Sequence, residues 1–189
     1  MIGLLLQVPA LVKAPLVEVN WEGAGELGVL LAGGWVLFAS RSGLGERSPL
    51  AFATGEHGIR IGRILLGVSL LPIGLSHFVY LKETAGLVPA WLPFRTGWVY
   101  LTGTAHIAAG LGVLFSIVPR VAATMEAGML GVFTLLVWVP RVAATPAARV
   151  PWTEFFISWA IAAGAWVVAD GIPSRPSTRP PSGIPSRKV

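Results

Sequence analysis

The chain alternates long apolar segments with short segments that carry most of its charged residues. Two segments lack Asp, Glu, Lys and Arg altogether, and three shorter ones are bounded by a single charge or two. About 20 apolar residues in a helix cross a hydrocarbon core of about 30 Å. The pattern therefore predicts an all-α integral membrane helix bundle with five spans, at 22–40, 60–81, 97–117, 121–140 and 152–170.

Composition agrees with a lipid environment. Only 12% of the residues are charged and the mean hydropathy is +0.72, whereas a soluble domain carries about 25% charged residues. This excludes a soluble globular enzyme. Cysteine is absent, which excludes disulfides, iron–sulfur ligation and thiolate zinc sites within the chain. The sequence also lacks closely spaced metal ligands, so we expect no metal site.

Basic residues predict how the chain is oriented. The net charge is +5, but the basic residues are scattered over loops and a tail, which argues against nucleic acid as a partner. Because basic loops stay in the cytoplasm, we compared the two sides of the five-span arrangement. One side carries nine basic residues: Arg41, Arg47, Arg60, Arg63, Arg120, Arg175, Arg179, Arg187 and Lys188. The other side carries five: Lys13, Lys82, Arg95, Arg141 and Arg149. We therefore expect a multi-pass protein of the cell membrane (plasma or inner membrane) with a cytoplasmic C-terminus.

An internal repeat predicts how the chain is organised. Shifting the sequence by 131 residues aligns 11 identical residues within positions 4–38, including the pairs Trp21/Trp152 and Gly33/Gly164. We interpret 1–40 as the end of a first repeat, one span plus an apolar stub, and 60–170 as a complete four-helix repeat. The first repeat lacks its beginning. Either translation starts earlier than Met1, or the unit is a truncated duplicate completed by another subunit.

Two polar segments complete the predicted organisation. Residues 41–59 are expected to form a cytoplasmic loop between the repeats. Residues 171–189 carry no acidic residue and five prolines. Such a composition cannot bury a core, so we expect a disordered basic tail.

Ionisable residues inside the predicted spans are the candidates for chemistry, because each is costly in hydrocarbon. His77 and His106 fall at similar depths of neighbouring antiparallel spans, so they could line one cavity; a structural role for each, with Thr102 as the partner of His106, is the simpler alternative. Arg63 and Glu126 enter from the same side, which predicts a structural ion pair or a proton relay.

Two tryptophans complete the candidate site. Trp91 lies in the Pro-bearing segment 87–93, and Trp98 begins the next span. Both are candidates for framing a ligand. The alternative is that they anchor the protein at the membrane interface, where tryptophan is enriched.

Three short motifs lie within 60–170: Arg63-Ile-Leu-Leu-Gly67, Gly74-Leu-Ser-His77-Phe78 and His106-Ile-Ala-Ala-Gly110-Leu-Gly112. They resemble motifs of the DoxX family of four-helix bacterial membrane proteins. The family often has a basic residue in place of His77 and a glutamate in place of His106, so this chain has two imidazoles instead of a charge pair. The resemblance implies a membrane subunit of a quinone-linked oxidoreductase assembly.

Three functional hypotheses follow. In the first, the protein binds a quinone or similar lipophilic molecule between helices, with His77 and His106 as hydrogen-bond partners. Its expected partners are the lipid bilayer and either a soluble redox protein or further copies of the chain in the membrane. In the second, it is a non-catalytic membrane scaffold or assembly factor. A small transporter is the third, favoured only by the duplication.

Overall fold

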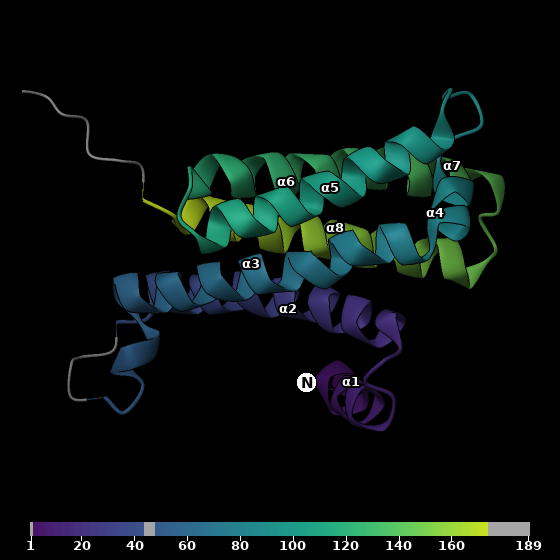
Figure 1. The fold of residues 1–189 in the computed structure, drawn as a ribbon. Helices are drawn as coiled ribbons and strands as arrows, with labels where there is room; N and C mark the ends of the chain where they lie inside the picture. Colours follow the sequence, from purple (N-terminus) through teal and green to yellow (C-terminus); the bar gives the residue numbers. More distant parts are fainter. Residues whose placement is uncertain (1, 44–47, 174–189) are drawn as a thin grey trace, which may run out of the picture.

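The computed structural model describes residues 2–43 and 48–173, and these residues are almost entirely helical (Figure 1). Five long helices form the bundle: α2 (Glu18–Arg41), α3 (Gly55–Val79), α5 (Arg95–Leu114), α6 (Pro119–Phe133) and α8 (Arg149–Gly171). Each packs against the next along the chain, and α8 packs back against α2 to close a ring. The predicted all-α fold is confirmed for the described part of the chain.

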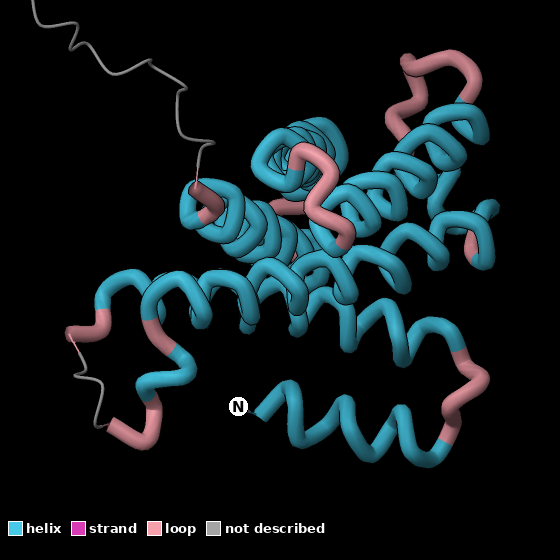
Figure 2. Tube along the Cα trace, turned by 60° about the vertical axis from the view of Figure 1, so that its left-hand side comes forward, coloured by secondary structure: helices cyan, strands magenta, loops and turns pink. Residues whose placement is uncertain are grey.

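Shorter elements lie around this ring. α1 (Ile2–Lys13) packs against α2, and Figure 2 shows it outside the bundle. The 3-10 turn η1 (Ala51–Ala53) precedes α3, and α4 (Leu81–Leu87) follows it. α6 continues through the π-helical turn η2 (Thr134–Trp138) into α7 (Val139–Ala144). α4 and α7 lie at the same end of the bundle (Figure 1).

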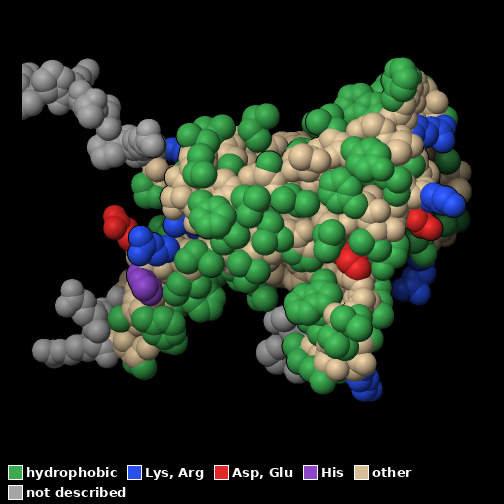
Figure 3. All heavy atoms as spheres, in the orientation of Figure 1, with side chains coloured by type: hydrophobic (Ala, Val, Ile, Leu, Met, Phe, Trp, Pro, Cys, Tyr) green, Lys and Arg blue, Asp and Glu red, His purple; other side chains and the backbone are tan. Residues whose placement is uncertain are grey.

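Four segments of the described chain are long and apolar enough to cross a membrane: 18–41, 55–79, 119–144 and 149–171. Their outer faces carry many exposed large apolar side chains. Figure 3 shows hydrophobic side chains over the middle of one face, with most of its charged side chains towards the two ends. A surface of this kind fits lipid better than water, which indicates a membrane protein. The count of five spans stays a prediction, because α5 is not one of these four segments.

Several predicted boundaries differ from the observed ones. α3 begins at Gly55, so part of the predicted loop 41–59 is helical. Packing explains this early start, since Gly58 lies directly against Ala53 and Ala39. α8 runs to Gly171 and Ile172 is buried, so the bundle includes the first residues of the predicted tail. The rest of the tail, 174–189, lies outside the described residues.

The end of α5 shows why the third predicted span was too long. The amide of Ile117 donates to the Gly112 carbonyl, and Ser116 adopts a positive φ of 60°. This geometry is a Schellman motif, which usually places glycine at the left-handed position. A glycine at this position would have marked the end of the helix in the sequence. The chain has Ser116 instead, so the predicted span continued to 117.

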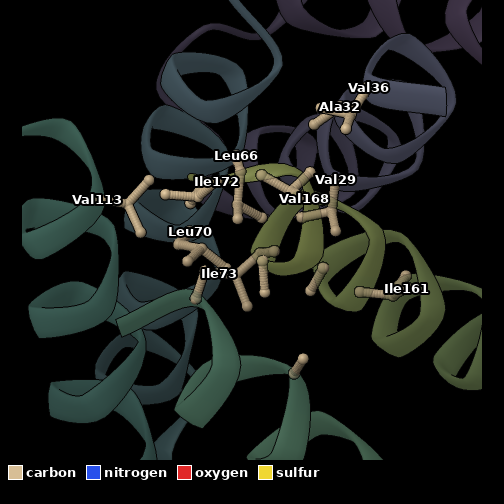
Figure 4. Close-up of a cluster of buried hydrophobic side chains, with 14 residues drawn as sticks. Val29, Ala32, Val36, Leu66, Leu70, Ile73, Val113, Ile161, Val168 and Ile172 are labelled. Atoms are coloured by element: carbon tan, nitrogen blue, oxygen red, sulfur yellow. The ribbon is translucent and has the colours of Figure 1, made fainter. Parts of the chain in front are cut away.

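The bundle core consists of small and branched apolar side chains. Val29 from α2, Leu66 and Leu70 from α3, Val113 from α5 and Val168 from α8 are completely buried (Figure 4). All five long helices contribute to this cluster, and α6 does so through Ala123 and Ala127. One core therefore holds the described helices together.

Glycines allow the helix backbones to approach closely. A Cβ added at Gly67 would lie 3.0 Å from the Gly110 carbonyl oxygen, and one added at Gly74 would lie 2.8 Å from that of Gly103. These two pairs, seven residues apart on each helix, bring antiparallel α3 and α5 together. Small residues at crossings are the usual device for packing helices in membranes.

The segments that match at a shift of 131 residues also share local structure. α2 begins at Glu18 and α8 at Arg149, which are 131 residues apart. Trp21 Nε1 donates to the Pro15 carbonyl at 2.8 Å, and Trp152 Nε1 donates to that of Pro146 at 2.9 Å. The same turn thus precedes both helices, and in each a tryptophan of the first helical turn bonds back to it. α2 and α8 meet at Gly33 and Gly164, again a matched pair. The domain boundaries drawn from this repeat stay a prediction.

Candidate functional site

His77 and His106 lie side by side where α3 crosses α5. Their ring centroids are 5.0 Å apart. The backbone of each histidine faces a glycine on the other helix: a Cβ at Gly103 would lie 2.8 Å from His77 Cβ, and one at Gly74 would lie 3.1 Å from His106 Cβ. The glycine motifs around the two histidines therefore have a direct structural consequence, because larger residues there would force the imidazoles apart.

Each imidazole is oriented by a hydrogen bond that involves Nδ1. His77 Nδ1 lies 2.9 Å from the Ile73 carbonyl, to which only an N–H can donate, so a neutral ring has its lone pair on Nε2. His106 Nδ1 lies 2.6 Å from Glu126 Oε1, and both side chains are buried. Glu126 projects from α6, so this pair ties α5 to α6.

The partners of His106 and Glu126 differ from those expected from the sequence. Thr102 does not bond His106, because its hydroxyl donates to carbonyls of its own helix, those of Trp98 and Val99. Arg63 and Glu126 form no ion pair. The reason is helix order in the ring: α3 packs against α2 and α5, whereas α6 packs against α5 and α8.

Arg63 instead lines a separate cavity at the opposite end of the bundle from α4 and α7. Its neighbours there include Glu56, His57, Arg60 and Ser116. These residues come from the start of α3 and the turn after α5. Arg63 is therefore not part of the site around the two histidines.

A polar chamber of about 290 Å³ opens beside the histidines. His77 and His106 both line it, as do Glu22 and Glu26 from α2 and Glu154 from α8. Its other walls come from α3 to α6, η2 and α8, and they include the apolar residues Ile73, Leu87, Met129, Leu130, Phe133, Trp138 and Ile161. The chamber lies towards the end where α4 and α7 are found.

The three glutamates of the chamber were not singled out in the sequence. Glu22 is tied to α3, since Ser76 Oγ lies 3.0 Å from Glu22 Oε1 and can donate to it. No Lys or Arg side chain in the described residues pairs with any of the three. Glu18, Glu22 and Glu26 are spaced four residues apart, which places carboxylates on one face of a helix. That spacing is the signal in the sequence that could have singled out Glu22 and Glu26.

An apolar groove of about 680 Å³ lies on the other side of Glu126, between α5 and α6. Trp98, Ala105 and Ala109 contribute one wall, and Met125, Gly128, Val132 and Leu136 contribute the other. Glu126 is the only ionisable side chain among the described residues that line it. Its Oε2 is buried and has no hydrogen-bond partner within the part of the chain that the structure describes. Such an atom is costly unless something donates to it.

The groove and the chamber meet at the His106–Glu126 pair. His106 faces the chamber and Glu126 faces the groove. Four further residues line both cavities: Thr84, Thr102, Met129 and Phe133. The pair is therefore the polar link between an apolar groove and a polar chamber.

The π-helical turn in the α6 to α7 segment lies next to this junction. Pro140 cannot donate a backbone hydrogen bond and its ring crowds the carbonyl four residues earlier, so the preceding turn widens. Trp138, at the end of that turn, lines the chamber. Widened turns of this kind often occur at functional sites.

The two tryptophans predicted to frame a ligand are separated in the structure. Trp98 lines the groove and is held in place because its Nε1 donates to the Pro93 carbonyl at 3.0 Å. Trp91 is 70% exposed in the segment between α4 and α5 and lines neither the groove nor the chamber. Within 2–43 and 48–173, no three His, Asp or Glu side chains come together as a metal site.

Fold and site together define a class: an all-α membrane bundle with a buried imidazole–carboxylate pair between two cavities. Residues 66–168 match the family described as Domain of unknown function (DUF8561), and the chain belongs to this family. The matched region contains His77, His106 and Glu126. Comparison with curated proteins and with solved structures gave no match.

Proposed function

We propose that the chain is a DoxX-like membrane subunit of a quinone-linked oxidoreductase assembly, which binds a quinone or a similar lipophilic molecule between its helices. The observation that carries this proposal is the apolar groove between α5 and α6 that ends at the buried His106–Glu126 pair. Ligand sites are typically apolar cavities of about 300–1,000 Å³ with a few polar groups that orient the ligand. The groove has this character and this size.

Each part of the site has a role in the proposal. The ring of the ligand lies in the groove against Trp98 and the α5 and α6 side chains. Glu126 contacts the polar group of the ligand, and the hydrogen bond between His106 and Glu126 fixes the position of the carboxyl group. His77 and the chamber glutamates provide a polar region on the far side of the pair. The soluble redox partner, or further copies of the chain, would dock on surfaces outside this site.

Filling the groove is expected to abolish ligand binding. Ala105 lines the groove, whereas Ala108, one turn on, is exposed and lines neither cavity. We expect Ala105→Phe to weaken binding of a short-tailed benzoquinone by about tenfold or more, which corresponds to about 1.4 kcal/mol. The measurement is isothermal titration calorimetry of the purified protein in detergent.

Ala108→Phe is the matched control and is expected to bind as the wild type does. Equal weakening by both substitutions would contradict a site in the groove. If the wild type binds neither a quinone nor the corresponding quinol, and neither is found in an organic extract of the membrane-purified protein, the scaffold hypothesis takes precedence.

We also propose that the end of the bundle with α4 and α7 faces outwards and that the C-terminus is cytoplasmic, as the basic residues predict. The absence of cysteine allows a clean test with single cysteines. Ser116 and Thr145 are both exposed and lie in loops at opposite ends of the bundle. A membrane-impermeant maleimide added to intact cells should label Thr145→Cys and not Ser116→Cys. Labelling of Ser116→Cys alone would reverse the orientation.

A further inference from the structure

The free oxygen of Glu126 determines which polar group the groove accepts. His106 Nδ1 and Glu126 Oε1 are 2.6 Å apart, so one proton lies between them. If that proton is on nitrogen and Glu126 is ionised, Oε2 accepts hydrogen bonds; if it is on Oε1, Oε2 is a carbonyl oxygen and again accepts. Oε2 would be a donor only in a neutral Glu126 that carried its proton there, and the 2.6 Å separation, as short as a charge-assisted hydrogen bond, favours the first two arrangements. In these two arrangements Oε2 needs a donor, and no described residue supplies one.

The other polar groups along the groove offer little to a ligand that needs a donor. Trp98 Nε1 already donates to the Pro93 carbonyl. The hydroxyls of Thr84 and Thr102 already donate to carbonyls of the main chain nearby. The remaining hydroxyl in the lining belongs to Thr124, an exposed residue. Among the described polar groups that line the groove, the buried one without a partner is therefore Glu126 Oε2.

We infer that the groove selects the reduced, hydroxyl-bearing form of its ligand, a quinol, over the oxidised quinone. This inference rests on the proposed function and specifies the ligand form. A quinol hydroxyl can donate to Glu126 Oε2 and satisfies the buried oxygen. A quinone carbonyl is itself an acceptor, so it would place two acceptors against each other in an apolar site. The rest of the groove has an apolar lining, so it does not distinguish the two rings.

Three ligands that share one ring and one short tail test the inference. They are a benzoquinol, the corresponding benzoquinone, and the benzoquinol dimethyl ether, which is reduced but cannot donate. Calorimetric titration of wild-type protein in detergent, under argon, should give a dissociation constant for the quinol about tenfold or more below those of the other two. This is the effect expected of one hydrogen bond to a buried acceptor.

A substitution of Glu126 provides a second test of the inference. Glu126→Gln replaces Oε2 with an amide that can turn to present either a donor or an acceptor, so the ratio of quinol to quinone affinity should fall to about one. Glu83→Gln, on the exposed surface of α4 and outside both cavities, should retain the wild-type ratio. The ligand series in the wild type remains decisive even if Glu126→Gln fails to fold.

The outcomes separate this inference from the proposed function. Quinone or ether affinity equal to that of the quinol in the wild type would overturn the selection while leaving a quinone-type site in place. An unchanged ratio in Glu126→Gln would also overturn it. Failure of all three ligands to bind the wild type would overturn the proposed function, and the inference with it.

Discussion

His106→Leu is expected to lower the free energy of unfolding by about 3 kcal/mol or more, because it leaves Glu126 buried without its partner. Glu126 is 1% exposed, and its second oxygen already lacks a hydrogen bond. Removing one member of a buried pair costs more than the pair contributes, since the remaining polar group has lost both water and partner. Thermal unfolding in detergent, followed by tryptophan fluorescence, measures the effect.

The double variant His106→Leu/Glu126→Leu distinguishes this cause from a general packing defect. With both polar groups removed, no buried group is left unsatisfied, so much of the lost stability should return. His57→Leu, at an exposed position of α3, controls for the loss of an imidazole and should be close to neutral. A double variant that is less stable than His106→Leu would contradict the explanation.

Gly33→Ala is expected to destabilise the bundle by about 1–3 kcal/mol through overpacking. A Cβ at Gly33 would lie 2.6 Å from Gly164 Cα, so the obstacle is backbone and cannot move aside as a side chain can. The contact is the crossing of α2 and α8, which closes the ring of helices. The same unfolding measurement in detergent reports the change.

The neighbouring residue supplies a closely matched control. A Cβ at Gly34 would meet nothing within 4 Å, so Gly34→Ala should be neutral or stabilising by up to about 1 kcal/mol, since alanine favours helix over glycine. The destabilisation by Gly164→Ala should lie between the effects of these two substitutions, because a Cβ there would lie 3.0 Å from its nearest neighbour, the Val29 carbonyl oxygen. Equal effects of Gly33→Ala and Gly34→Ala would show that α2 and α8 do not cross at these glycines.

The two stability predictions also concern ligand binding, because the helix contacts that they test hold the groove between α5 and α6 in place. The crossing at Gly33 closes the ring, and the ring places α5 against α6 with Glu126 between them. A variant that opens the ring should therefore also weaken binding in the groove. Ala105→Phe differs, since it fills the groove without touching the crossing of α2 and α8. Comparing binding with stability across these variants separates loss of the site from loss of the fold.

Part of the candidate site was predictable from spacing along the helices. His77 and His106 were expected to line one cavity because antiparallel neighbours at similar depth must bring them close. The glycine motifs around them indicated close helix approach. The predicted pairing of Arg63 with Glu126 was wrong because depth along a helix says nothing about which helices are neighbours. Arg63 and Glu126 were expected at similar depths, but they lie on α3 and α6, and α5 packs between these two helices.

The sequence by itself determined the medium, the helical class and which residues would be costly to bury, because these follow from local hydropathy and from the cost of charge in hydrocarbon. Only the tertiary structure decided that Glu126 pairs with His106, that Glu22, Glu26 and Glu154 share a chamber, and that Glu126 also lines an apolar groove. These features depend on the order of helices around the ring and on the rotation of each helix about its axis. Both are set by long-range packing at glycines and small residues, which the linear pattern does not encode.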